Sequence, residues 1–196
     1  MVVLSGSNSK PLAKQLAEAL NWEHHSLETR RFPDTEGYIR IPSEVIDVVR
    51  KEPVVLVSNT FPDSGIVETL LMLEAINDVR TGKMENLKNI GPQELEDVGP
   101  GVLLAIPYFG YSRQDKRFNP GEAISAKAIG NLLASRCDGI IVFDIHEPKV
   151  LNGLSVPVAF TSAMPELARH LQQEVKPDFI LSPDKGAIER ASEVAK

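Results

Sequence analysis

The sequence predicts an α/β domain built on a mostly parallel sheet with helices on both faces. Short apolar runs, typical of strands buried on both sides, alternate along the chain with longer segments whose apolar residues recur at helical spacing. Strands and helices that alternate in this way form crossover units, which place the strands parallel in one sheet. Polar residues follow several of the apolar runs, at the strand ends where open α/β sheets bind ligands.

The composition is that of an ordinary globular protein, with 42% hydrophobic and 24% charged residues in 196. A net charge of -6 argues against a general nucleic-acid binder, which usually carries a basic excess. Cys137 is the single cysteine, which excludes an internal disulfide and fits a reducing compartment. No apolar run approaches the roughly 20 residues that span a bilayer, and no signal peptide is visible. We therefore expect a cytoplasmic protein without membrane or nucleic-acid partners.

The first strand is expected at residues 2–4, and a helix with one face on the sheet at residues 12–20. Between them lies a Gly/Ser turn in which Ser9 can cap the helix. Such a turn can bind phosphate through backbone N–H groups, but with one glycine an ordinary strand-to-helix turn is the better interpretation. Residues 30–37 form a charged turn before an exposed strand at 38–41, and the residues alone favour a solvated hairpin tip.

The middle of the chain continues the alternation of strands and helices. We expect a short helix at 43–51, a buried strand at 53–58, a loop ending in a helix cap at 59–64 and a buried apolar helix at 66–79. Residues 80–101 are polar with several Gly and Pro, and are predicted to be a surface excursion without assigned chemistry. Another buried strand is expected at 102–106, and a helix from near Glu122 to about Arg136.

The loop at 107–127, between that strand and that helix, gathers three cations in an acidic chain. Arg113, Lys116 and Arg117 lie between Tyr111 and Phe118 in the sequence. Cationic groups suit phosphate, and flat aromatic rings suit a base, so this composition fits a nucleotide. A solvated loop with an ordinary charge cluster fits the residues equally well.

The last part of the chain places further polar residues at strand ends. Strands are expected at 139–143, 156–160 and 178–181, with a helix at 163–175 and the start of another before Lys196. His146 and Asp184 follow two of these strands, on the edge that we expect to carry Arg113. Together they form a partial shell for Mg²⁺, which needs few protein ligands, whereas catalytic Zn²⁺ usually has three. A lone histidine such as His146 is more commonly a half-buried structural residue.

Together these segments resemble the ribose-phosphate pyrophosphokinase (PRPP synthetase) family, and nearly the whole chain takes part in the resemblance. Five segments match in order: 4–7 (Leu-Ser-Gly-Ser), 31–36 (Arg-Phe-Pro-Asp-Thr-Glu), 107–116 (Pro-Tyr-Phe-Gly-Tyr-Ser-Arg-Gln-Asp-Lys) with 124–127 (Ile-Ser-Ala-Lys), 144–146 (Asp-Ile-His) and 182–186 (Ser-Pro-Asp-Lys-Gly). The third segment is highly specific, and the Asp-Lys-Gly of the last is most similar to archaeal members.

The resemblance implies two similar halves of phosphoribosyltransferase type, the first complete at residues 1–161 and the second beginning at 162–196. The implied reaction transfers the pyrophosphoryl group of ATP to ribose 5-phosphate, giving PRPP and AMP for nucleotide biosynthesis. The family's catalytic Lys/Arg loop has no counterpart in these 196 residues. We therefore expect no catalytic residue in this span and a sequence that is cut at Lys196.

The resemblance also assigns residues to the site. The hairpin segment would hold adenine in a neighbouring subunit's site of a homo-oligomer, through Phe32, Asp34, Thr35 and Glu36. Arg113 and Gln114 would contact ATP, and His146 and Asp184 would serve the catalytic Mg²⁺.

Two departures from the family pattern stand out: Glu147 replaces the usual alanine beside His146, and the 80–101 segment is longer than usual. The alternatives are a non-catalytic, PRPP-synthetase-like regulatory subunit and a generic nucleotide-binding α/β domain. Catalytic Lys and Arg beyond Lys196 would decide for the enzyme.

Overall fold

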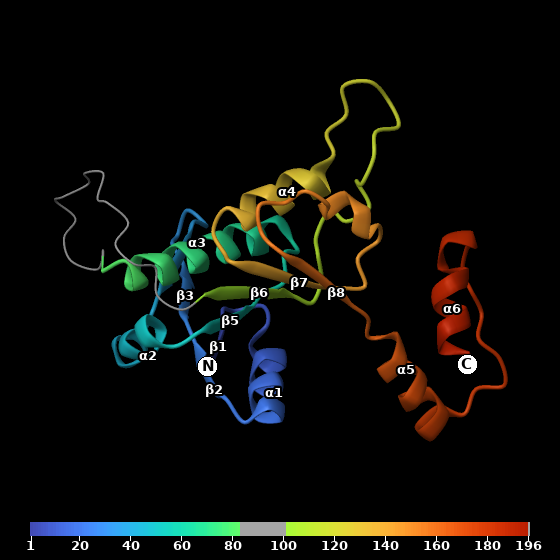
Figure 1. Ribbon diagram of the computed structural model, residues 1–196, viewed down its shortest axis with the longest axis horizontal. Coiled ribbons are helices and arrows are strands. Elements are labelled where there is room, and N and C mark those ends of the chain that lie inside the picture. The colour runs from blue at the N-terminus through green and yellow to red at the C-terminus, as the bar shows by residue number, and fades with distance from the viewer. Residues whose placement is uncertain (83–100, 196) are drawn as a thin grey trace. The chain divides into compact units, whose positions relative to one another are not determined.

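A computed structural model of the chain describes residues 1–82 and 101–195 (Figure 1). The chain divides into two compact units, Met1–Phe160 and Thr161–Lys196, which are considered separately. The boundary lies one residue before the expected end of the first half. The prediction that the second unit begins a similar half stays a prediction.

The first unit is built on a six-stranded sheet in the order β2-β1-β5-β6-β7-β8. The strands are β1 (Val2–Ser5), β2 (Glu23–Ser26), β5 (Val54–Val57), β6 (Val102–Ile106), β7 (Gly139–Phe143) and β8 (Val158–Thr161). β1 pairs in parallel with β2 and β5, β5 with β6, and β6 with β7. The predicted mostly parallel sheet is therefore confirmed.

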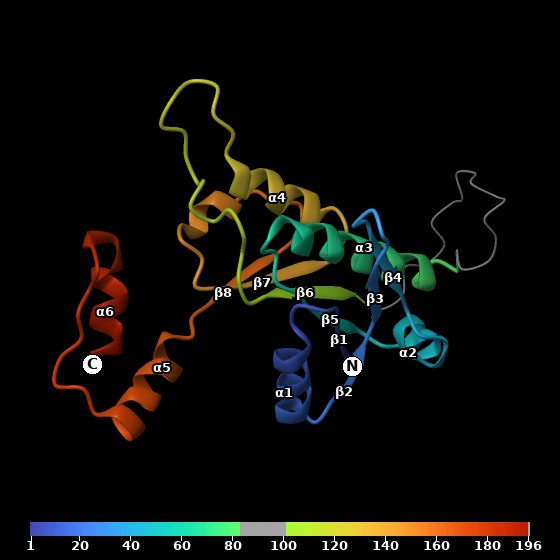
Figure 2. The same ribbon diagram turned by 180° about the vertical axis from the view of Figure 1, so that it is seen from behind.

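Helices cover both faces of this sheet, as predicted. α1 (Lys10–Leu20) lies on one face, while α3 (Asp63–Arg80) and α4 (Ser125–Ala134) lie on the other, as the two opposite views show (Figures 1 and 2). The short α2 (Ile46–Lys51), preceded by a 3-10 turn at Ser43–Val45, packs beside α3. Among the described residues, no helix has the length and apolar composition needed to cross a membrane.

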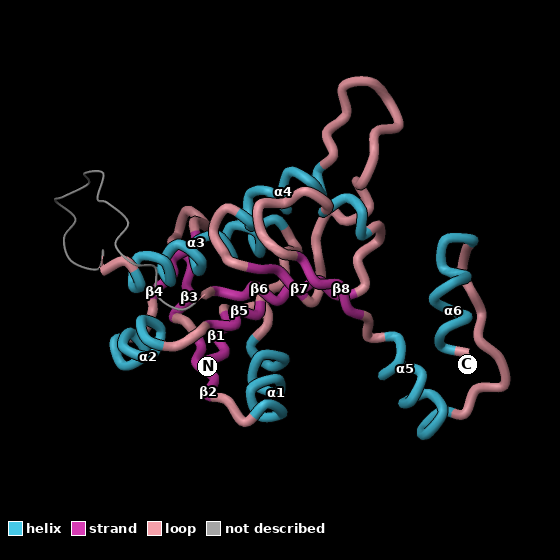
Figure 3. The backbone as a smooth tube through the Cα atoms, in the orientation of Figure 1, coloured by secondary structure: helices cyan, strands magenta, loops and turns pink. Residues whose placement is uncertain are grey.

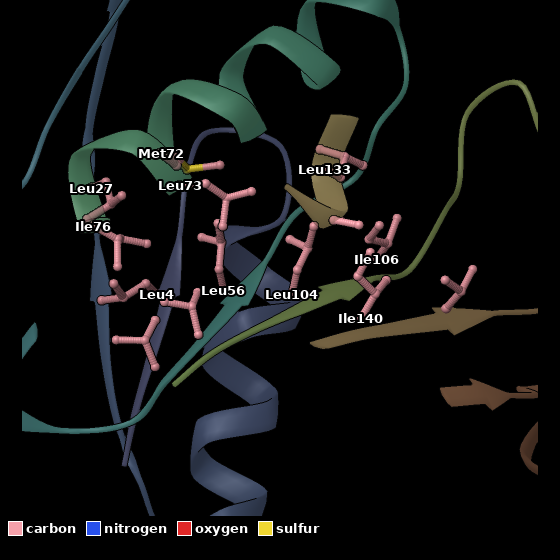
Figure 4. Packing of buried hydrophobic residues seen from close by; sticks show 14 of the residues in the cluster. Leu4, Leu27, Leu56, Met72, Leu73, Ile76, Leu104, Ile106, Leu133 and Ile140 are labelled. Carbon is pink, nitrogen blue, oxygen red and sulfur yellow. The ribbon is translucent and has the colours of Figure 1, made fainter. Parts of the chain in front are cut away.

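The hydrophobic core has a layer on each face of the sheet, because successive side chains along a strand point to opposite faces. On the face under α3 and α4, Leu4, Leu56 and Leu104 are fully buried (Figure 4). On the other face, α1 contributes only the small residues Ala13 and Ala17 to the buried layer. One face of α1 therefore packs on the sheet as predicted, and small residues form its buried part.

The charged turn forms the tip of a separate antiparallel hairpin, β3 (Glu28–Arg31) and β4 (Gly37–Arg40). β4 lies against α3. The guanidinium of Arg30 stacks over the ring of Tyr38, the residue opposite it in the pairing, at 4.2 Å. β2 and β3 were not predicted, because their residues are polar and lack the apolar alternation by which a buried strand is recognised.

Several helix ends differ from the prediction. Ser9 occupies the N-cap position of α1, but its hydroxyl makes no capping hydrogen bond and instead accepts from the Asn59 N–H at 3.0 Å. α4 begins at Ser125 and not near Glu122, because the carboxylate of Glu122 accepts from the Phe118 N–H at 2.7 Å and closes a turn within the preceding loop. α4 also ends at Ala134, two residues before the expected Arg136.

Arg80 does not belong to a surface excursion, which corrects the prediction for residues 80–101. It is the last residue of α3, only 6% exposed, and donates to the carbonyls of Val49, Glu52 and Gly101. Residues 83–100 of that predicted segment lie outside the described residues. Cys137 is half-buried against the core, and burial raises the pKa of its thiol to about 11.

The second unit contains α5 (Met164–His170), a π-helical turn at Leu171–Val175 and α6 (Ile188–Val194), which agrees with the expected helices. The strand predicted at 178–181 is not formed, and Phe179 and Leu181 are 79% and 81% exposed. A parallel strand needs a neighbour for its backbone groups. No other strand exists among the described residues 162–195 to provide one.

Candidate functional site

Three loops meet where β1, β5 and β6 end at the carboxyl edge of the sheet, and Figure 3 shows them as connections between strands and helices. Asn59, the second residue after β5, ties them together. Its N–H donates to Ser9, its carbonyl accepts from the Asn8 side chain at 2.9 Å, and its side-chain oxygen accepts from the Tyr108 N–H at 2.9 Å. The edge is therefore a hydrogen-bonded platform and not a set of independent loops.

The Gly/Ser turn after β1 is closed by the chain's own carboxylate. Glu68 of α3 accepts from the Ser7 N–H at 2.6 Å and from the Ser7 hydroxyl at 2.7 Å. A Cβ at Gly6 would lie 2.2 Å from the Glu68 Oε1, so a larger residue here would have to displace this carboxylate. Because the carboxylate occupies donors that a phosphate would need, the geometry supports the ordinary turn over a phosphate loop.

The structure distinguishes the three cations of the loop between β6 and α4. The Lys116 ammonium lies 5.3 Å from the centre of the Phe118 ring, and the Arg117 Nε donates to the Glu122 carbonyl at 2.7 Å. Both of these side chains thus serve the loop itself. The Arg113 side chain is exposed, and no hydrogen bond or ion pair to another residue within 1–82 and 101–195 holds its guanidinium.

The backbone around Arg113 is well defined by hydrogen bonds. The Gln114 N–H donates to the Tyr111 carbonyl at 2.9 Å, which places Arg113 inside a tight turn. The Gln114 carbonyl accepts from the Ala126 N–H at 3.3 Å, in the first turn of α4. Arg113 and Gln114 are thus presented to solvent between the carboxyl end of β6 and the start of α4.

The hairpin tip gathers the four residues that the resemblance assigns to adenine. The Phe32 N–H donates to the Glu36 carbonyl and the Thr35 N–H to the Phe32 carbonyl, each at 2.9 Å. The Asp34 carboxylate accepts from the Glu36 N–H at 3.1 Å. The Phe32 ring meets Tyr38 edge-on at 5.9 Å and is 40% exposed. The tip is therefore preformed, with an aromatic ring open to a ligand or partner.

A cavity of about 640 Å³ lies between this hairpin and the first half of α3. Its size falls in the range of small-molecule sites. Thr35 and Glu36 line it, together with Val67 and Leu71 of α3, but neither Arg113 nor Gln114 does. Within the described residues, this cavity thus does not combine the hairpin residues with the Arg113 turn.

The two predicted metal ligands occupy different units. His146 is exposed just after β7, in the first unit, and Asp184 lies in the second. The Asp184 carboxylate caps the 3-10 turn Lys185–Ala187 by accepting from the Ala187 N–H at 3.0 Å. Within the described part of the chain, no group of three or more His, Cys, Asp or Glu side chains could hold a metal. A shell formed by these two residues stays a prediction.

Glu147, the acidic residue beside His146, is committed to the local backbone. Its carboxylate accepts from the Lys149 N–H at 3.1 Å and caps the 3-10 turn Pro148–Leu151. This hydrogen bond gives the unusual carboxylate a structural role next to the histidine.

A parallel sheet with helices on both faces and polar loops joined at its carboxyl edge belongs to the open α/β class, whose members bind ligands at that edge. The comparisons with known proteins narrow this class. The family described as "N-terminal domain of ribose phosphate pyrophosphokinase" matches residues 1–85 and 101–136. The chain therefore belongs to the ribose-phosphate pyrophosphokinase family.

Curated relatives agree with this assignment. The ribose-phosphate pyrophosphokinase of Methanobrevibacter smithii is 37% identical over 100% of this chain and 59% of its own length. That of Methanothermobacter thermautotrophicus is 38% identical over 99% of this chain and 61% of its own length. The chain thus spans about three fifths of these relatives. Phosphoribosylpyrophosphate synthetase from Mycobacterium smegmatis has the same fold, with a TM-score of 0.74 at 22% identity, over 99% of this chain and 60% of that one.

Proposed function

We propose that this protein is a ribose-phosphate diphosphokinase, which transfers the pyrophosphoryl group of ATP to the anomeric hydroxyl of ribose 5-phosphate and yields PRPP and AMP. Within a chain of this family, the observation that carries the proposal is the exposed Arg113 turn at the carboxyl edge of the sheet. An enzyme of nucleotide biosynthesis of this kind would act in the cytoplasm.

In this proposal the chain positions ATP and neutralises charge. Phosphoryl-type transfer demands little covalent chemistry from a protein, so that placement and electrostatics dominate. Arg113 is a permanent cation whose planar fork fits phosphate oxygens, and its guanidinium is exposed to receive them. Gln114, its neighbour in the turn, orients the nucleotide without adding charge.

The hairpin residues Phe32, Asp34, Thr35 and Glu36 would hold the adenine across a subunit boundary of a homo-oligomer. The preformed tip and the exposed ring of Phe32 support this role. The separation of the hairpin cavity from Arg113 also supports it, since two chains would supply what one does not combine. A strictly monomeric protein with full affinity for ATP would contradict the shared site.

His146 and Asp184 would hold Mg²⁺ together with substrate phosphates. The bound ion would neutralise charge on the phosphate oxygens. His146 offers an exposed imidazole at the strand end, and Asp184 keeps one carboxylate oxygen on the Ala187 N–H while the other oxygen has no hydrogen bond to a described residue. Residues 162–196 would then begin the second half of the enzyme.

Asp184→Asn tests the metal role without removing the helix cap. Asparagine caps helix ends as well as aspartate does, so the hydrogen bond to Ala187 is retained and only the charge is lost. We expect the Mg²⁺ concentration for half-maximal activity to rise by about 10-fold or more, because even the loss of a group that only supports metal ligands typically costs about 10–100-fold in affinity. Asp178→Asn, an exposed carboxylate in the same unit, is the matched control. An unchanged Mg²⁺ dependence would remove Asp184 from the shell.

The function itself is tested by ribose 5-phosphate-dependent release of AMP from ATP and Mg²⁺, in purified protein that carries the family's catalytic Lys/Arg loop. AMP formation that requires the sugar phosphate, with PRPP as the second product, is the expected result. Retained binding of MgATP without turnover would instead identify a non-catalytic, regulatory relative. Loss of both would leave the fold assignment and overturn the proposed site.

A further inference from the structure

A tyrosine and a carboxylate form a clasp between the loop of Arg113 and the start of α3. The Tyr111 hydroxyl donates to the Asp63 Oδ1 at 2.8 Å. Asp63 is the first residue of α3, whereas Tyr111 belongs to the loop after β6. The clasp therefore joins two segments 48 residues apart in the sequence, at the carboxyl edge of the sheet.

The backbone at Tyr111 has an unusual conformation that needs support. Its φ is 62°, in the left-handed region that side chains other than Gly, Asn and Asp rarely adopt. A bulky residue in that region persists only when surrounding contacts hold it, and such positions cluster at functional sites. The turn that begins with Tyr111 contains Arg113 and is closed by the Gln114 N–H, so the direction of Arg113 depends on this conformation.

Hydrogen bonds to Thr60 hold the residues that precede Tyr111 in the same loop. The Gly110 N–H donates to the Thr60 hydroxyl at 2.7 Å, and the Thr60 N–H donates to the Tyr108 carbonyl at 3.1 Å. A Cβ at Gly110 would lie 2.2 Å from the Thr60 carbonyl oxygen, so the two loop backbones approach too closely for any residue other than glycine. Beyond Gly110, the Tyr111–Asp63 contact is the next tether before the turn of Arg113.

We propose that Asp63 and Tyr111 are positioning residues that aim the Arg113 guanidinium at the phosphates of the nucleotide. This inference rests on the proposed function. The clasp acts through the left-handed turn at residue 111 and does not itself touch the ligand. It therefore sets the affinity for MgATP with little effect on the stability of the fold.

The exposure of the clasp favours a local role over a structural one. The Tyr111 side chain is 41% exposed, and a hydrogen bond that competes with water contributes little to global stability. The hydrogen bond to Asp63 and the charge of its carboxylate raise the pKa of the Tyr111 hydroxyl above its usual value. This shift gives a direct signature that the clasp is formed in solution.

The test measures MgATP binding by calorimetry in the absence of ribose 5-phosphate, in the purified protein. We expect Tyr111→Phe and Asp63→Ala each to raise the Kd for MgATP about 10-fold, with the midpoint of thermal unfolding unchanged. Asp63→Asn should retain most of the affinity, because the amide oxygen can still accept from the tyrosine. Asp47→Ala, an exposed carboxylate in the first turn of α2, is the matched control for Asp63→Ala.

A combination with Arg113→Ala decides whether the clasp acts through that residue. If it does, Tyr111→Phe changes the Kd by less than about 2-fold in the Arg113→Ala background, because coupled residues are not additive. The same 10-fold loss in both backgrounds would overturn the inference and leave the proposed function intact. No effect of Arg113→Ala on the Kd would overturn both.

A spectroscopic measurement tests the contact without any ligand. In protein labelled at the tyrosine ring carbons, NMR titration should show the pKa of Tyr111 falling in Asp63→Ala relative to the unsubstituted protein. A Tyr111 titration that is insensitive to Asp63 would show that the clasp is absent in solution, and would overturn the inference.

Discussion

We expect Arg113→Ala to lower kcat/KM for ATP by about 10²–10³-fold, the usual cost of removing one preorganised electrostatic contact to a reacting group. Lys116 and Arg117 cannot take over, because one lies against Phe118 and the other donates to the Glu122 carbonyl. Steady-state measurement of ribose 5-phosphate-dependent AMP release, with ATP varied, checks this expectation.

Arg113→Lys separates charge from geometry. Lysine keeps the positive charge but replaces the planar fork by a single ammonium, so it should recover only part of the lost activity. Arg136→Ala is the control for loss of an exposed arginine. Arg136 pairs with Glu74 at 3.0 Å on the surface, and such pairs contribute little. Equal losses in Arg113→Ala and Arg136→Ala would contradict the assignment of Arg113 to the site.

The sequence predicted those parts of the fold whose pattern is set by burial on both faces. β1, β5, β6 and β7 are short apolar runs, and runs of that length are typical of parallel strands that are buried on both faces of a sheet. β2 and β3 were not predicted, because their residues are polar and these strands are stabilised by pairing with neighbouring strands. His24 in β2 illustrates this, since its ring meets the Ser5 hydroxyl at 2.9 Å and burial lowers its pKa.

For the candidate site, the sequence drew attention to the loop at 107–127 but did not show its internal organisation. The cation cluster at 113–117 indicated an anion. The structure adds that, of its three cations, Arg113 is the one whose side chain makes no hydrogen bond, ion pair or ring contact with another described residue. Asn59, Glu68 and Asp63 were missed, because a polar residue near a strand end gives no sign of its partner. Those partners lie roughly 50 residues away in the chain.

Arg80 was placed in a surface excursion because residues 80–101 are polar with several Gly and Pro, and the structure shows why this arginine is buried instead. Its guanidinium satisfies carbonyl groups at the end of α2 and just before β6, where chain direction changes at the amino edge of the sheet. Burial lowers the pKa of the guanidinium, while Asp138 acts in the opposite direction. The buried guanidinium donates to backbone carbonyls that no apolar side chain could pair.

We expect Arg80→Met to destabilise the protein by about 2 kcal/mol in urea denaturation, because a buried carbonyl left without a donor costs about 1–3 kcal/mol. The Val49 carbonyl loses a donor in a buried hydrogen bond and the Glu52 carbonyl loses one in a part-buried hydrogen bond, whereas the Gly101 carbonyl still accepts from the Val54 N–H. Part of this cost is offset because the guanidinium no longer has to be desolvated, and because its Nη1 has no partner in the structure. Methionine fills most of the volume, so the comparison isolates the hydrogen bonds.

The sign of this effect decides between two accounts of the buried arginine. If desolvation of the charge outweighs the hydrogen bonds, Arg80→Met will be as stable as the unsubstituted protein or more stable, as replacements of buried ion pairs have been. Our expectation is the reverse, since all three acceptors are backbone carbonyls that remain in place after the substitution. Arg50→Met, at an exposed position of α2, controls for the general effect of exchanging arginine for methionine.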